Sequence, residues 1–150
     1  MSLEQRINSD IKTAMRAKDK EQLRGLRAIK SALLLAKTQK GGADGLNEAA
    51  EIKILSKLVK QRKDSVAIFQ QQNREDLAAK EIAEITVIQA YLPEQMDEAA
   101  IKAAIAKIME TTGASSMRDM GKVMGMANKQ LAGKAEGKVI AGIVKQMLQS

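Results

Sequence analysis

The chain has 150 residues, a formal net charge of +7, one proline, and no cysteine, histidine or tryptophan. This length suits one domain or two small ones. The missing residue types exclude disulfide frameworks, zinc fingers and catalytic triads built on histidine.

Hydropathy predicts no membrane or secretion signal. The first ten residues lack the apolar stretch of about 7–15 residues that a signal peptide needs. The longest uncharged runs, 65–73 and 85–93, are nine residues long, whereas a membrane-spanning helix needs about 20. We therefore expect a soluble, cytoplasmic protein with no membrane partner.

The positive charge is spread over the chain. Residues 1–92 carry 17 basic and 12 acidic side chains, and residues 93–150 carry 8 and 6. A basic balance of this kind favours a polyanionic partner without identifying it.

The first 45 residues predict two helices and a loop. Ser2 with Gln5, and then Asp19 with Gln22, form capping patterns. Apolar residues follow each pattern at helical spacing, at positions 3, 7, 11 and 15 and at 23, 26, 29 and 33. These patterns predict one helix from residue 3 to about 17 and another from about 20 towards 40. The composition of 41–45 predicts a loop that reverses the chain.

Residues 46–92 predict two further helices. Asn47 caps a long helix with apolar positions 52, 55, 59, 66 and 69, and Arg62 falls on the same face. Asn73, with Asp76 three residues later, predicts the start of a fourth helix with apolar positions 77, 82, 85, 88 and 92. Pro93 ends it, because the residue before a proline is pushed away from helical dihedrals. We place a domain boundary at 91–95.

Three more helices follow. Asp97 caps the first, which ends at Gly113. Ser116 with Asp119 caps the second, and the third begins after Gly137 with apolar pairs at 139/140, 143/144 and 147/148. No segment alternates with a period of two. We therefore predict an all-α chain, with a helical N-terminal domain (a long helical hairpin) over 1–92 and a small three-helix domain over 93–150.

No residue pattern marks an active site. Ser115 and Ser116 lie in no nucleophile elbow, and Ser116 suits a helix cap better. Glu81 and Glu84 lie one turn apart, and we expect them on a solvated helix face rather than in a metal site. We therefore predict no catalytic residue, no metal and no cofactor.

A glycine–lysine cluster is the most unusual part of the sequence. Gly121 and Gly125 lie one turn apart inside a predicted helix, where each costs about 1 kcal/mol relative to alanine. Either they allow close helix packing, or they let a polyanion backbone approach beside Lys122. Lys134 and Lys138 lie near the start of the last helix, where free backbone N–H groups favour phosphate. Glycine spacing alone favours packing.

A second basic run lies on the predicted third helix. It consists of Lys57, Lys60, Arg62 and Lys63, and Asp64 partly neutralises it. Such a run is usually a solvated face. Because the chain has only two aromatic residues, we expect contact with nucleic acid to go through phosphate and shape rather than through bases. This favours a folded RNA.

Methionines gather between positions 117 and 126. Such density occurs both in cores and on adaptable partner surfaces. Met117, Met120 and Met124 share an apolar face with Val123, which favours a core. Met126 falls off this face, and we expect it to be exposed.

Four segments, taken in order, carry a family resemblance. They are KQRKDS at 60–65, NREDLA at 73–78, YLPEQM at 91–96 and GASSMRDMGKVMG at 113–125. Each is weak alone, but their order and their spread over most of the chain make the match strong. They resemble the YqeY-like (GatB/YqeY domain) proteins, small bacterial chains related to the tail of the B subunit of the glutamine-dependent Asp-tRNA/Glu-tRNA amidotransferase.

The resemblance implies an all-helical, two-domain protein whose C-terminal domain is similar to the amidotransferase tail, which helps to hold tRNA by its elbow. The tRNA-binding positions that it implies here are Gly121, Lys122, Gly125, Gly133, Lys134, Gly137 and Lys138. The family is also labelled with glutamine-dependent carbon–nitrogen ligase activity. This sequence has room for neither the large catalytic domain nor the separate amidase subunit, so we expect no amidotransferase activity from it alone.

We therefore expect a tRNA-binding accessory or stand-alone module, with tRNA as partner and room for a protein partner in tRNA or translation metabolism. One alternative is a protein-interaction adaptor that docks a protein through its long N-terminal helices and Met126. Another is an enzyme component that assists amide transfer in trans. A helix-turn-helix DNA binder ranks lower, because the last helix carries only Lys138 and Lys145 as basic groups.

Overall fold

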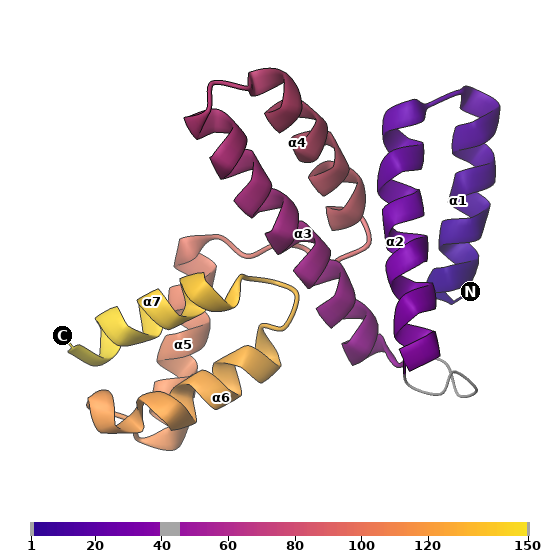
Figure 1. Ribbon diagram of the computed structural model, residues 1–150. Coiled ribbons are helices and arrows are strands. Elements are labelled where there is room, and N and C mark those ends of the chain that lie inside the picture. The colour runs from indigo at the N-terminus through magenta and orange to yellow at the C-terminus, as the bar shows by residue number, and fades with distance from the viewer. Residues whose placement is uncertain (1, 40–45, 150) are drawn as a thin grey trace. The chain divides into compact units, whose positions relative to one another are not determined.

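The computed structural model describes residues 2–39 and 46–149, and these residues form helices and turns without any strand (Figure 1). The chain divides into two compact units, residues 1–92 and 93–150. The loop predicted at 41–45 lies outside the described residues. The N-terminal unit contains α1 (Leu3–Ala17), α2 (Lys20–Gln39), α3 (Glu48–Gln71) and α4 (Glu75–Gln89). The C-terminal unit contains α5 (Glu98–Thr112), the short 3₁₀ helix η1 (Met117–Asp119), α6 (Met120–Gln130) and α7 (Gly137–Gln149).

The predicted helix starts are confirmed at α1, α2, α3 and α5. At α1, the Ser2 hydroxyl accepts from the Gln5 backbone N–H at 3.2 Å, and the Gln5 side chain accepts from the Ser2 N–H at 2.9 Å. At the other three helices a side-chain oxygen of Asp19, Asn47 or Asp97 accepts from the N–H three residues later, at 2.8–3.1 Å. Each cap satisfies a backbone donor that the first helical turn leaves unpaired.

The start of α4 differs from the prediction. Asn73 does not cap this helix: it adopts a left-handed conformation (φ 58°), and Arg74 takes the cap position without a side-chain cap hydrogen bond. Asp76 instead accepts two hydrogen bonds from the Arg74 guanidinium, both at 3.1 Å. A three-residue connection between antiparallel helices needs a left-handed residue to turn the chain, and asparagine tolerates that conformation better than most residues do.

The C-terminal turns follow the predicted chemistry with one difference. Gly113 ends α5 with φ 71°, as predicted. The next helix begins as the 3₁₀ turn η1, and Asp119 accepts from the N–H groups of Ser115 (3.0 Å) and Ser116 (3.4 Å). The carboxylate of Asp119 is therefore held at the start of η1.

The core of the N-terminal unit lies where α2 crosses α4 and where α1 and α3 pack beside them (Figure 1). A Cβ atom added to Gly25 would lie 2.6 Å from Cβ of Val87, so the two helix backbones meet unusually closely at this point. The buried residues are Ile7, Ala14, Leu26, Ile29, Leu33, Leu55, Val59, Ile85, Val87 and Ile88.

Two residues of the N-terminal unit that were predicted to lie on apolar core faces are exposed. Met15 is 55% exposed and Ile82 is 46% exposed. Helix α4 is covered by α3 and also by α2. The contact with α2 buries Val87, which was not among the predicted apolar positions of this helix. One apolar stripe in a sequence predicts a helix that is covered on one side, so it does not reveal a helix that is covered on two sides.

The C-terminal unit has a separate core between α5, α6 and α7. The segment before α5 is held to the α6–α7 turn, because the Met96 N–H donates to the Lys134 carbonyl at 2.9 Å and the Gln95 side chain donates to the Gly133 carbonyl at 2.6 Å. The buried residues are Ile101, Ile105, Ile108, Val123, Ala127, Leu131, Ile140, Ile143, Val144 and Leu148.

Candidate nucleic-acid interface

The outer face of α6 carries a shallow, open depression, which is called the groove below. Val123 and Ala127 turn towards the core of the C-terminal unit, and the residues on the opposite side of the helix are left to line the groove. Helical spacing brings together residues three, four and seven positions apart. The lining residues are Gly121, Lys122, Gly125, Met126, Asn128 and Lys129.

The two glycines of this groove contact no neighbouring helix. A Cβ atom added to Gly121 or to Gly125 would meet nothing within 4 Å, and both residues are exposed. Within the described residues of the C-terminal unit, close helix packing therefore does not explain this pair. What the missing side chains leave is a strip of open backbone beside Lys122 and Lys129.

The charge of the C-terminal unit is polarised along its sequence. Residues 120–150 contain five lysines and one acidic residue, whereas residues 93–119 contain three basic and five acidic residues. Neither α6 nor α7 carries an aspartate or glutamate. The positive charge thus belongs to the helices that follow η1, including the helix with the open groove.

Gly133 and Lys134 have a structural role that the sequence did not indicate. Gly133 has φ 75°, a backbone conformation that favours glycine. The carbonyls of Gly133 and Lys134 accept the hydrogen bonds from Gln95 and Met96. The Lys134 side chain is exposed, but neither residue lines the groove on α6.

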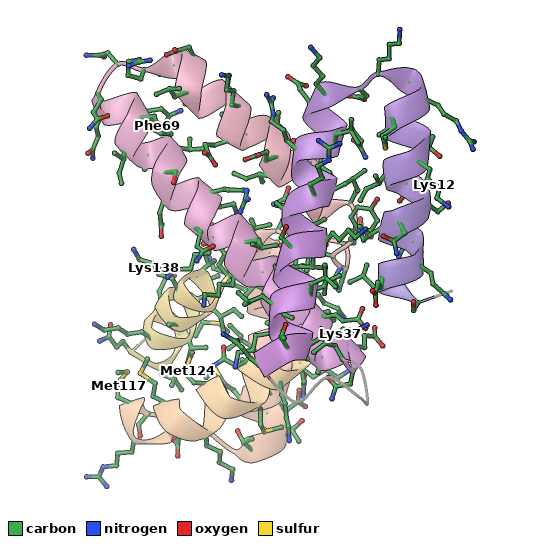
Figure 2. All side chains as sticks on the ribbon, turned by 45° about the vertical axis from the view of Figure 1, so that its right-hand side comes forward. Lys12, Lys37, Phe69, Met117, Met124 and Lys138 are labelled. Carbon is green, nitrogen blue, oxygen red and sulfur yellow. The ribbon has the colours of Figure 1, made fainter. Side chains whose placement is uncertain are left out.

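Gly137 and Lys138 form the beginning of α7, away from the groove. Gly137 is the first residue of the helix, and Figure 2 shows Lys138 on its first turn, apart from Met117 and Met124. Glu136 comes directly before the helix, and its carbonyl accepts from the Ile140 N–H at 3.0 Å. A carboxylate at this position opposes the attraction of a helix N-terminus for phosphate.

Of the seven positions implied by the resemblance, the structure therefore brings together Gly121, Lys122 and Gly125. It adds Asn128 and Lys129 to the same groove, and sequence reasoning missed both of these. Their helical spacing was the available signal, since Lys129 lies seven residues after Lys122 and four after Gly125.

The basic run on α3 is split between two environments. Lys57, Lys60 and Lys63 are exposed. Arg62 instead points towards α4, where Nε lies 3.3 Å from the Glu84 carboxylate and Nη1 donates to the Leu58 carbonyl at 3.1 Å. The Arg62 and Glu84 side chains are only 17% and 19% exposed.

Glu84 was therefore wrongly expected on a solvated face, because it forms an ion pair between α3 and α4. Among residues 2–39 and 46–149, no three acidic side chains come together in a way that could hold a metal ion. In the same ranges, no helix is long and apolar enough to span a membrane.

The methionines near α6 mostly join the core. Met120, Met124 and Met126 are partly buried and pack against the buried residues of the C-terminal unit. Met126 was expected to be exposed, and this prediction is wrong because its side chain reaches the core from the edge of α6. Met117 is the exposed member of the group, at 39%.

Comparison with known proteins identifies the family. A family model described as "Yqey-like protein" matches residues 4–148. A protein named "Altered inheritance of mitochondria protein 41, mitochondrial" from Pyrenophora tritici-repentis is 31% identical over 137 residues, which cover 87% of this chain and 71% of that protein.

Two other fungal proteins of the same name are similar. The one from Clavispora lusitaniae is 31% identical over 96% of this chain and 84% of its own length. The one from Vanderwaltozyma polyspora is 35% identical over 76% of this chain and 64% of its own length. These three relatives are fungal, and their names describe them as mitochondrial. The family resemblance in the sequence had instead pointed to small bacterial chains. The chain belongs to the YqeY-like protein family.

Proposed function

We propose that this protein is a tRNA-binding module that contacts the phosphate backbone through the groove on α6 and has no catalytic activity on its own. The observation that supports this most directly is the open backbone at Gly121 and Gly125, which no described side chain or helix fills. Lys122 and Lys129 lie along the same groove. A ligand that approaches a backbone closely beside two lysines suits a polyanion.

The chemistry of the groove favours phosphate over base recognition. No aromatic residue lines it, so bases have no ring on which to stack. Its two lysines act as point charges, which suit phosphate oxygens. We therefore propose binding by charge and shape, with Lys134 and Lys138 as weaker contributors and Lys57, Lys60 and Lys63 as a secondary patch.

The proposed cellular role is accessory. The module would present or hold tRNA for a glutamine-dependent, amidotransferase-related complex or for another protein of translation. Its relatives' names point to mitochondria, and the cytoplasm expected from the sequence stays a prediction. Both compartments contain tRNA.

The test is a titration of the full chain against total tRNA at two salt concentrations, with duplex DNA as competitor. Lys122→Gln/Lys129→Gln should lower the salt slope of log K by about 1.5, because each lost phosphate contact removes about 0.7–0.9. Lys102→Gln/Lys107→Gln removes the same charge from α5 of the same unit and should leave the slope near that of the unmodified protein. Equal effects of the two variants would refute the groove as the site.

A protein-interaction adaptor is the second candidate, and exposed leucines favour it. Leu34 and Leu35 on α2 are 47% and 60% exposed, and such apolar residues on a helix are typical of protein contacts. A complex with a defined protein that survives nuclease treatment and high salt would support the adaptor. If nuclease treatment removes that complex, the interaction depends on RNA and the adaptor is not supported.

A further inference from the structure

One face of α2 carries a row of exposed cations. Lys20, Arg24 and Arg27 are spaced by four and three residues and are all exposed, while Leu26 and Ile29 occupy the buried side of the same helix. At 1.5 Å per residue, the row extends about 10 Å along the helix axis. It lies on the N-terminal unit, which contains no part of the α6 groove.

None of the three side chains has a partner within residues 2–39 and 46–149. Other basic residues in the chain do, including Lys37 with Glu4, Arg62 with Glu84, and Arg74 with Asp76. The two arginines of α2 therefore hold free guanidinium groups at the surface. A planar guanidinium offers paired N–H donors that fit two phosphate oxygens.

The row is electrostatically unfavourable for the isolated helix. Like charges at i,i+3 and i,i+4 destabilise a helix by about 0.2–0.5 kcal/mol per pair. Lys20 with Arg24, and Arg24 with Arg27, form two such pairs. Glu21, the only acidic residue of α2, lies three residues before Arg24 and offsets part of this repulsion. A bound anion beside the row would relieve this repulsion.

The basic patch on α3 offers no unpaired arginine. Lys60 has Asp64 four residues later, so an opposite charge lies beside it. Arg62 is already paired with Glu84. The row on α2 thus keeps two unpaired arginines, whereas the only arginine of the α3 patch is paired with Glu84.

We propose that the Lys20–Arg24–Arg27 face of α2 is a second phosphate-contacting surface, so that the N-terminal unit also binds the tRNA backbone. This inference rests on the proposed tRNA-binding function and extends it to a unit in which the family resemblance placed no site. The contacts are ionic and go to phosphate oxygens without reading base sequence.

The experiment measures binding of total tRNA to the full chain by fluorescence anisotropy at several salt concentrations. Arg24→Gln/Arg27→Gln should weaken binding about tenfold near 0.1 M salt and lower the salt slope by about 1.5. The matched control is Lys53→Gln/Lys80→Gln, which removes two exposed charges from α3 and α4 of the same unit. Circular dichroism checks that all variants keep their helices.

Each outcome decides between the two proposals. A large effect of the α2 variant and a small effect of the control support the inference. Equal effects of these two variants, with the unmodified protein binding tRNA, overturn the inference and leave the proposed function in place; the α2 face would then be a candidate protein-docking surface. No tRNA binding by the unmodified protein overturns both proposals.

Discussion

Gly25 shows how one missing side chain sets the distance between two helices. An alanine Cβ at this position would lie 2.6 Å from Cβ and 2.7 Å from Cγ1 of Val87, far inside normal contact distances. Replacing glycine by alanine in a helix usually stabilises it by about 1 kcal/mol. At Gly25 we expect overpacking, which costs about 1–3 kcal/mol, to outweigh this gain.

The matched control for Gly25→Ala is Gly121→Ala, because a Cβ at Gly121 meets no atom within 4 Å. Urea unfolding should show a lower free energy of unfolding for Gly25→Ala and a higher one for Gly121→Ala. If Gly25→Ala also stabilises the protein, α2 and α4 do not meet as closely as described. Gly121→Ala should at the same time weaken tRNA binding, since the added methyl group stands in the groove.

Tyr91 lies just after α4 and is hydrogen-bonded to α1. This contact makes the stability of the fold depend on pH in the alkaline range. Its hydroxyl donates to the Asp10 carboxylate, and the Arg6 guanidinium lies 5.1 Å from its ring centre. Burial, and then the hydrogen bond to Asp10, raise the pKa of Tyr91 far above its ordinary value of about 10. The folded state therefore favours the protonated phenol.

The sign of the pH effect follows from this raised pKa. The stabilisation is fully present below the ordinary tyrosine pKa of about 10 and is lost as the pH rises above it, because only the unfolded chain then ionises readily. Urea unfolding should show a fall in stability above pH 10 that is smaller in Tyr91→Phe. Tyr91 is the only tyrosine and the chain has no tryptophan, so phenolate absorbance reports its titration directly. A midpoint near 10 in the folded protein would contradict the partly buried hydrogen bond between Tyr91 and Asp10.

At the scale of elements, the half-buried pair between Arg62 and Glu84 fixes α3 against α4. The pair is hydrogen-bonded at 3.3 Å, and Arg62 also donates to the Leu58 carbonyl. Arg62→Ala leaves the Glu84 carboxylate without this partner at a site with little solvent, which we expect to cost about 1–3 kcal/mol.

Lys60→Ala is the control for Arg62→Ala, because Lys60 lies on the same helix and is exposed. Thermal unfolding should show a clear loss of stability for Arg62→Ala and almost none for Lys60→Ala. Similar small effects of both would mean that Arg62 is a surface cation like its neighbours.

Local chemistry explains which elements the sequence predicted well. The caps at Ser2, Asn47 and Asp97 depend on residues three positions apart, and the alignment of Gly121 with Gly125 on one helix face depends on residues four positions apart. The pairing of Arg62 with Glu84, the covering of Val87 by α2, and the hydrogen bond from Gln95 to Gly133 join residues far apart in sequence. No local pattern records such contacts, so the structural role of Gly133 and the partner of Arg62 were not predictable, although helical spacing had placed Arg62 on the apolar face of its helix.

At the scale of the whole molecule, the two units have separate cores, and we expect each unit to have an unfolding transition of its own. Tyr91 lies in the N-terminal unit, so tyrosine fluorescence reports that unit, whereas circular dichroism reports the helices of both.

Ile105 is fully buried in the C-terminal unit, and Ile105→Ala should cost about 2–5 kcal/mol. We expect this variant to lose helical signal at a lower temperature while its tyrosine transition stays in place. The control is Ile29→Ala, which removes an equally buried side chain from the other core and should shift the tyrosine transition. If Ile105→Ala shifts both signals together, the chain unfolds as one cooperative domain. The boundary predicted at 92/93 would then not separate two units that unfold independently.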